Sequence, residues 1–124
     1  MRPIIAVASL LLLLQLALPV RADATGEEIA YLLSFIRKSS CTFIRNGSEY
    51  DGPAAADHVQ QKYDYYKGDI RTAEDFIDRA ATKSLLSGDP YKVRCGSGSP
   101  VLAADWLRSV LQSYRTHQAP QGTQ

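Results

Sequence analysis

Two side chains on one predicted helix have the chemistry and the spacing that an anion-binding or acid–base site needs. His58 and Lys62 are four residues apart, so they share one face of a helix. Three further polar residues are candidates for the same pocket: Arg45, Glu74 and Tyr91. Such a pocket would bind an anion, or would use His58 as a general base.

The alternative interpretation of this cluster is structural. His58 would bond a loop carbonyl, and Lys62 would pair with a nearby acid such as Glu74. A single histidine is a weak sign of catalysis, so the structural interpretation is favoured. The sequence contains no phosphate-binding glycine loop, nucleophile elbow or zinc-ligand motif, and we therefore expect no cofactor and no metal.

A predicted β-hairpin must hold Arg45 near the helix that carries His58. Asn46-Gly47 lies between two short runs of aromatic and β-branched residues, and this dipeptide favours a two-residue type I′ turn. The short loop sets the register, with Phe43 opposite Tyr50 and Arg45 opposite the residue after the turn. Asn46 is counted with the candidate polar cluster, next to Arg45.

Periodicity and end signals predict four helices around the hairpin, over residues 26–39, 53–67, 72–88 and 99–115. The first is expected to be capped by Thr25, and small alanines at the start of the second suggest a close approach, such as to the hairpin. The fourth has the widest apolar stripe, from Leu102 through Trp106 to Tyr114, and Trp106 is its expected anchor. Residues 91–95 alternate like a strand. The predicted fold is mainly α with a small antiparallel β element, and it is consistent with a third short strand.

The first residues have the features of a secretory signal peptide. Met1-Arg2 precedes an apolar run, and small residues follow at two candidate cleavage sites, before Asp23 and, preferred, before Thr25. An uncleaved membrane anchor is the less favoured alternative. We therefore expect a signal peptide over 1–24, one globular domain over 25–115 and a disordered tail over 116–124.

Charge and cysteine content narrow the possible partners and the compartment. Loss of Arg2, Arg21 and Asp23 from fourteen basic and thirteen acidic residues would leave twelve of each. A nearly neutral chain lacks the positive surface that binds nucleic acid or an anionic membrane, so neither partner is expected. The two cysteines of an exported chain, Cys41 and Cys95, are expected to form one disulfide.

Four short motifs resemble a known family. They are Phe43-Ile44-Arg45-Asn46-Gly47, His58 with Lys62, Thr72-Ala73-Glu74-Asp75-Phe76-Ile77, and Ser87-Gly88-Asp89-Pro90-Tyr91. In this order they resemble the YfeK-like family of small exported bacterial proteins, also called domain of unknown function 5329. The resemblance implies a periplasmic location and supplies no activity.

Two classes of function follow from these observations. The first is a non-enzymatic binding or interaction module of the cell envelope, whose partner is an unknown envelope ligand or protein. The chain is small and has no recognisable catalytic set, which favours this class. The alternative is a small envelope hydrolase or lyase with His58 as its general base.

Overall fold

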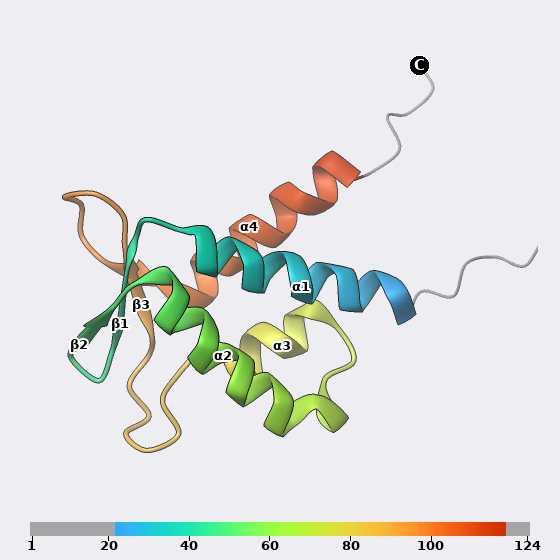
Figure 1. Cartoon of the computed structure of the whole chain (residues 1–124), viewed down its shortest axis with the longest axis horizontal. Coiled ribbons are helices and arrows are strands. Elements are labelled where there is room, and N and C mark those ends of the chain that lie inside the picture. The colour runs from blue at the N-terminus through green and yellow to red at the C-terminus, as the bar shows by residue number, and fades with distance from the viewer. Residues whose placement is uncertain (1–21, 119–124) are drawn as a thin grey trace, which may run out of the picture.

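The computed structural model describes residues 22–118, which form a layer of helices with a small sheet at one end (Figure 1). The helices are α1 (Ala22–Lys38), α2 (Gly52–Tyr66), α3 (Ala73–Ala80) and α4 (Ala103–Gln118), with a short 3₁₀ turn, η1, over Lys67–Asp69. The strands are β1 (Thr42–Arg45), β2 (Ser48–Tyr50), β3 (Lys92–Arg94) and β4 (Val101–Leu102). The expected fold, mainly α with a small antiparallel element, is confirmed. Residues 1–21, which hold most of the expected signal peptide, and 119–124 lie outside the described residues.

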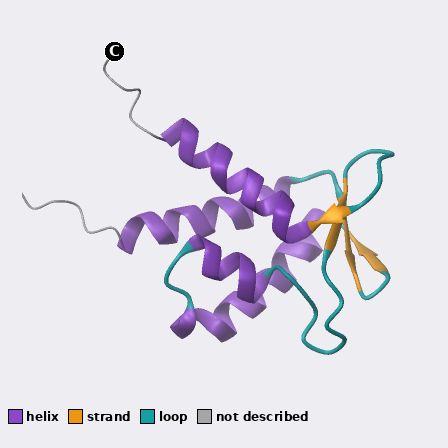
Figure 2. Cartoon of the chain, turned by 180° about the vertical axis from the view of Figure 1, so that it is seen from behind, coloured by secondary structure: helices purple, strands orange, loops and turns teal. Residues whose placement is uncertain are grey.

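The antiparallel sheet has the order β2-β1-β3-β4 (Figure 2). Phe43 pairs with Tyr50 and Arg45 with Ser48, as the turn predicts. Asn46 and Gly47 have φ values of 52° and 76°, the positive values that a type I′ turn requires. The hairpin prediction and the third strand, which pairs with β1, are both confirmed.

The two cysteines extend the β1–β3 ladder by one position. Thr42 lies opposite Arg94, so Cys41 and Cys95 follow as the next pair. Their sulfur atoms are within bonding distance, and their Cα atoms are 4.4 Å apart. The bond therefore joins the ends of two neighbouring strands.

The start of the fourth helix differs from the prediction. Residues 99–102 are not helical, because Val101 and Leu102 form β4 beside β3, and α4 begins at Ala103. Leu102 is 43% exposed and is not part of the helix stripe. Trp106 is only partly buried, so the expectation that it anchors α4 is wrong; the buried face consists of Ala103, Ala104, Leu107, Val110 and Leu111. The helix continues to Gln118, beyond the expected end at Arg115.

The third helix ends earlier than its apolar pattern predicts. Ala80 is its last residue, and both the Ala81 amide and the Thr82 hydroxyl donate to the Ile77 carbonyl, at 3.0 and 2.8 Å. This side-chain bond competes with the next helical hydrogen bond. Ser84, which lies within the predicted helix 72–88, is part of a loop and is buried there.

The start of α2 approaches the end of α1 very closely, at a glycine that the sequence pattern did not single out. A Cβ atom on Gly52 would lie 2.5 Å from the Ile36 carbonyl oxygen and 2.8 Å from that of Arg37. The close approach of α2 is therefore to the end of α1, and it requires glycine. Thr25 does not cap α1, which already starts at Ala22; its hydroxyl instead donates to the Arg71 carbonyl at 3.4 Å.

One apolar core lies between the helices and the inner face of the sheet. Its most deeply buried large side chains are Leu32 and Ile36 from α1, Phe76 and Ile77 from α3, Val93 from β3 and Leu107 from α4. The second helix adds Ala56 and Val59. Lys62 is also buried on this helix.

Candidate functional site

The hydroxyl group of Tyr91 joins the two helical residues that the sequence singles out. The Lys62 ammonium donates to it at 3.2 Å, and His58 Nε2 lies 3.0 Å from it. The rings of His58 and Tyr91 meet edge to face, with centroids 5.8 Å apart. His58 and Lys62 both face Tyr91, because residues four positions apart lie on the same side of α2, and this side packs over the segment that leads into β3.

Lys62 is a buried cation held by neutral groups. It is 8% exposed, and besides Tyr91 its ammonium contacts the Lys83 carbonyl oxygen at 2.8 Å. Within residues 22–118, no carboxylate forms an ion pair with it. The pairing of Lys62 with an acid, which the structural interpretation expected, is therefore wrong.

Arg45 is the third cation of this region. Its guanidinium lies over the Tyr50 ring, 4.6 Å from the centroid, and it lines the same pocket as His58. Burial is the main reason that the pKa of His58 is lowered, and the charges of Arg45 and Lys62 lower it further. Burial and then Arg45 also lower the pKa of Lys62, whereas burial raises the pKa of Tyr91.

Asn46 connects the hairpin turn to the loop that carries Tyr91. Its amide nitrogen donates to the Ser84 hydroxyl at 3.2 Å, and its amide oxygen accepts from the Ser87 hydroxyl. Three of the four motifs that carry the family resemblance thus meet here: the hairpin turn, the His58–Lys62 pair and the segment that ends at Tyr91.

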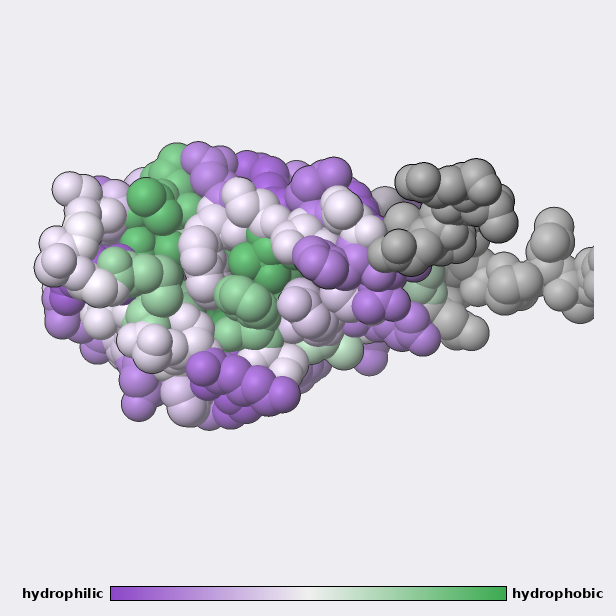
Figure 3. Space-filling view, turned by 90° about the horizontal axis from the view of Figure 1, so that it is seen from above, coloured by the Kyte–Doolittle hydropathy of each residue, from purple (hydrophilic) through white to green (hydrophobic). Residues whose placement is uncertain are grey.

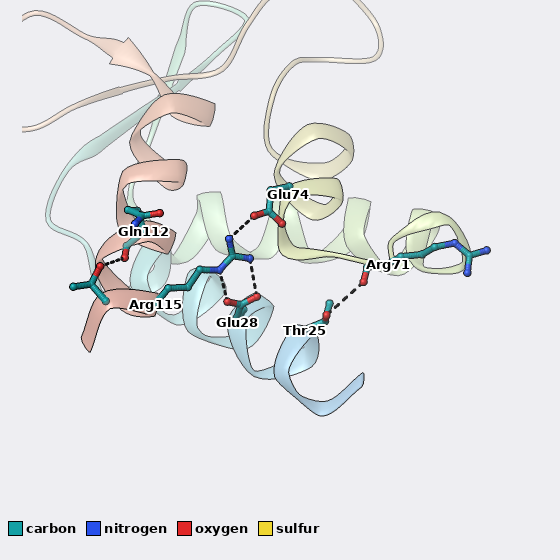
Figure 4. Close-up of polar contacts among 7 residues, drawn as sticks. Thr25, Glu28, Arg71, Glu74, Gln112 and Arg115 are labelled. Carbon is teal, nitrogen blue, oxygen red and sulfur yellow. Dashed lines mark hydrogen bonds and ion pairs between the residues drawn. The ribbon is translucent and has the colours of Figure 1, made fainter. Parts of the chain in front are cut away.

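Glu74 is not part of this cluster. Its carboxylate pairs with Arg115, which also holds Glu28 through two contacts of 2.6 and 3.0 Å (Figure 4). These contacts link α1, α3 and α4. Hydrogen bonding from Arg115 is the main reason that the pKa of Glu74 is lowered. The prediction that Glu74 would neutralise the cationic cluster is wrong, because the first turn of α3 faces α4.

A pocket of about 350 Å³ opens beside the cluster, between α2 and the sheet. Its floor is apolar and includes Ile36, Val59 and Leu107, whereas Arg45, Tyr50, His58, Tyr91 and Lys92 supply polar groups around it. The volume is within the range of small-molecule sites, about 300–1,000 Å³. A pocket of this kind would hold a ligand with one apolar part and one polar part.

Of the lining residues, only Arg45, His58 and Tyr91 were predicted as site residues, and those missed include Tyr50, Ala54 and Lys92. Tyr50 was assigned only a pairing role, although the predicted register already put it two positions from Arg45 across the turn. Lys92 was not expected at the pocket, because the strand alternation of 91–95 places its side chain on the face opposite Val93. Ala54 has no polar group to mark it.

A second, aromatic surface lies across α1 and α4. Tyr31 stacks on Tyr114 with ring centroids 4.2 Å apart, and the ring centroids of Phe35 and Trp106 are 5.4 Å apart. On the side of the molecule where α1 and α4 lie, apolar side chains reach the surface among polar ones (Figure 3). Tyr31 and Phe35 are 37% and 38% exposed, and serine and lysine side chains border this surface.

The described residues contain no arrangement of three or more histidine, cysteine, aspartate or glutamate side chains that could hold a metal ion. No helix within residues 22–118 is long and apolar enough to cross a membrane.

Comparison with known proteins defines the class to which this fold and pocket belong. Residues 23–115 match the family of unknown function DUF5329, and the chain therefore belongs to that family. It is also similar to the uncharacterised protein YfeK of Salmonella typhimurium, with 36% identity over 86 residues, covering 69% of this chain and 72% of that protein. These findings confirm the family resemblance. No solved structure matches the chain.

Proposed function

We propose that this protein is an exported, non-enzymatic binding module of the bacterial cell envelope, and that the pocket beside α2 is its ligand site. The observation that carries the proposal is the composition of the pocket. An apolar floor made of core residues lies next to a rim with a guanidinium, an imidazole and two phenols. A concave apolar site with a few convergent polar groups is the usual form of a small-molecule site.

The contacts of His58 favour binding over catalysis. A histidine base is usually oriented by a carboxylate on its second nitrogen. Within residues 22–118, His58 contacts Tyr91 and no acid, while the neighbouring Asp57 pairs with Arg37. The enzyme alternative based on His58 therefore has no supporting geometry, and binding is the function that we propose.

The proposed location rests on the sequence. The apolar run after Met1-Arg2, the two small-residue cleavage sites and the single pair of bonded cysteines all suit an exported protein of an oxidising compartment. The expected location is the periplasm, with no stable membrane association after signal cleavage. Fractionation of a bacterial host tests this part: the protein should appear in the periplasmic fraction with the mass of a chain beginning at Asp23 or Thr25.

The binding part is tested by blocking the pocket. Ala54 is exposed, lies in the first turn of α2 and lines the pocket, so Ala54→Leu should fill space there without disturbing the core. Ala30→Leu on the exposed side of α1 is the matched control. A panel of small apolar compounds of positive, negative and zero charge is screened by ligand-observed NMR.

At least one compound should bind the wild type and the control with similar affinity. The same compound should bind Ala54→Leu at least tenfold more weakly, which corresponds to a loss of about 1.4 kcal/mol of binding free energy. If no compound shows this dependence on Ala54, the pocket is not a ligand site and the proposed function is wrong.

A further inference from the structure

The charged groups around the pocket carry an excess of positive charge. Arg45 and Lys92 both line it, and within residues 22–118 neither forms an ion pair. Asp57 is the single acid of the lining, and its carboxylate already pairs with Arg37. Behind the rim, Lys62 adds a buried positive charge, and no acid of the described residues forms an ion pair with it.

Neighbouring acids do not correct this imbalance. Glu49, on the edge strand, pairs with Arg94 at 2.9 Å, and Glu74 pairs with Arg115 at the other end of α3. The rim therefore has unused positive charge and hydrogen-bond donors. Like charges held close together in a partly buried place are more stable when an anion lies among them.

The floor of the pocket requires an apolar group. Ile36, Val59 and Leu107 are at least nine-tenths buried and belong to the main core. Water in contact with such a floor has few hydrogen-bond partners, and an apolar group that displaces it gains free energy. The floor and the rim are adjacent, so a single ligand can reach both.

We infer that the ligand is a carboxylate joined to an apolar body, with the carboxylate at Arg45 and the apolar body against Ile36, Val59 and Leu107. Arginine suits this role because its planar guanidinium can donate two parallel hydrogen bonds to one carboxylate. This inference rests on the proposed function, because it names the ligand class of the same pocket.

Two sources supply this chemistry: a free carboxylic acid with an apolar chain, and the C-terminal residue of a peptide. Octanoate and the tripeptide acetyl-Ala-Ala-Leu represent them. Octanamide and the C-terminally amidated tripeptide keep the apolar part and lose the charge, and acetate keeps the charge alone. Binding of each probe is measured by isothermal titration calorimetry at neutral pH and low salt.

At least one carboxylate probe should bind about tenfold or more tightly than its amide, and acetate should bind far more weakly than octanoate. Arg45→Gln should weaken the binding of that carboxylate about tenfold. Arg108→Gln, which removes an arginine from the exposed side of α4, is the control and should change the affinity less than twofold.

The inference is overturned if neither carboxylate binds more tightly than its amide, or if Arg45→Gln leaves the affinity unchanged. A neutral or cationic compound that depends on Ala54 would then preserve the proposed function while excluding this ligand class. If octanoate is inactive and the free tripeptide binds, the source is a peptide end. If octanoate alone binds, the source is a free acid.

Discussion

The ammonium group of Lys62 donates to the hydroxyl of Tyr91 at 3.2 Å, and both side chains are more than nine-tenths buried. The second hydrogen bond of Lys62 goes to a backbone carbonyl, and its ammonium also lies 4.8 Å from the centroid of the Tyr91 ring, so among the described residues neutral groups stabilise this buried cation. His58 meets the same hydroxyl from the other side, which makes Tyr91 the centre of the cluster.

Tyr91→Phe should therefore destabilise the fold, although it removes only one hydroxyl group. It removes the shared oxygen and leaves the buried ammonium of Lys62 and the half-buried Nε2 of His58 each short of a partner, which costs about 1–3 kcal/mol. Lys62→Met should be close to neutral, because it removes a buried charge and keeps a long apolar chain. Urea denaturation measures both. A larger loss for Lys62→Met than for Tyr91→Phe would contradict the role given to Tyr91.

Gly52 should be intolerant of any side chain. Gly52→Ala would place a methyl group 2.5–2.8 Å from carbonyl oxygens at the end of α1, and the forced shift should cost about 1–3 kcal/mol or more. Gly26→Ala is the matched control, because nothing lies within 4 Å of its added Cβ. There alanine should stabilise α1 by about 0.5–1 kcal/mol. Equal thermal stability of the two variants would show that α1 and α2 do not meet as described.

The folded protein should lose stability as the pH falls through the range in which free histidine titrates. The groups around His58 are Arg45 on β1, Lys62 on α2 and Tyr91 before β3, with Asp57 and Lys92 also lining the pocket. They and burial keep the folded-state pKa of His58 below its unfolded value of 6.5.

Near and below that value the unfolded chain binds more protons than the folded chain, so the free energy of unfolding should fall. The loss begins near the unfolded pKa and is complete below the folded pKa. His58→Gln should remove this part of the pH dependence, whereas His117→Gln on the last turn of α4 should retain it. Unfolding curves of the three proteins between pH 4.5 and pH 8, the range covering the titration of histidine, provide the comparison. An unchanged slope in His58→Gln would refute the assignment.

The disulfide should contribute strongly to stability. It closes a loop with a sequence separation of 54 residues, for which the chain-entropy relation gives about 4 kcal/mol. Replacing both Cys41 and Cys95 by serine should lower the melting temperature, and reduction of the wild type should lower it to a similar extent. If reductant leaves the melting curve unchanged, the bond does not constrain the fold.

Local interactions made part of this structure predictable. The Asn46-Gly47 turn determined the hairpin register because both residues tolerate positive φ, and the strand ending at Cys95 followed from its alternation and from the cysteine count. The C-terminal end of α3 and the start of α4 were not predictable in this way. They depend on the hydroxyl bond from Thr82 to Ile77 and on the pairing of Val101 with Val93, two choices that periodicity does not encode.

The candidate site was also predictable only where local sequence determines the position of its residues. His58 and Lys62 share a face because of their spacing, and Arg45 is near them because the hairpin leads directly into α2. The partner of Glu74 is 41 residues away in the sequence, and no local pattern links it to Arg115. The pocket floor consists of ordinary core residues, whose exposure to a cavity depends on packing.

The most direct test of the pocket as a binding site is an amide chemical-shift map of the isotope-labelled protein, titrated in turn with octanoate and with acetyl-Ala-Ala-Leu. We expect the shifts to change first and most around Arg45, Ala54, His58 and Lys92, which surround the pocket. The Ala54→Leu variant should lose these changes, and Ala30→Leu should keep them. Changes confined to Phe35 and Trp106 on the α1–α4 surface, or none at all, would contradict the account.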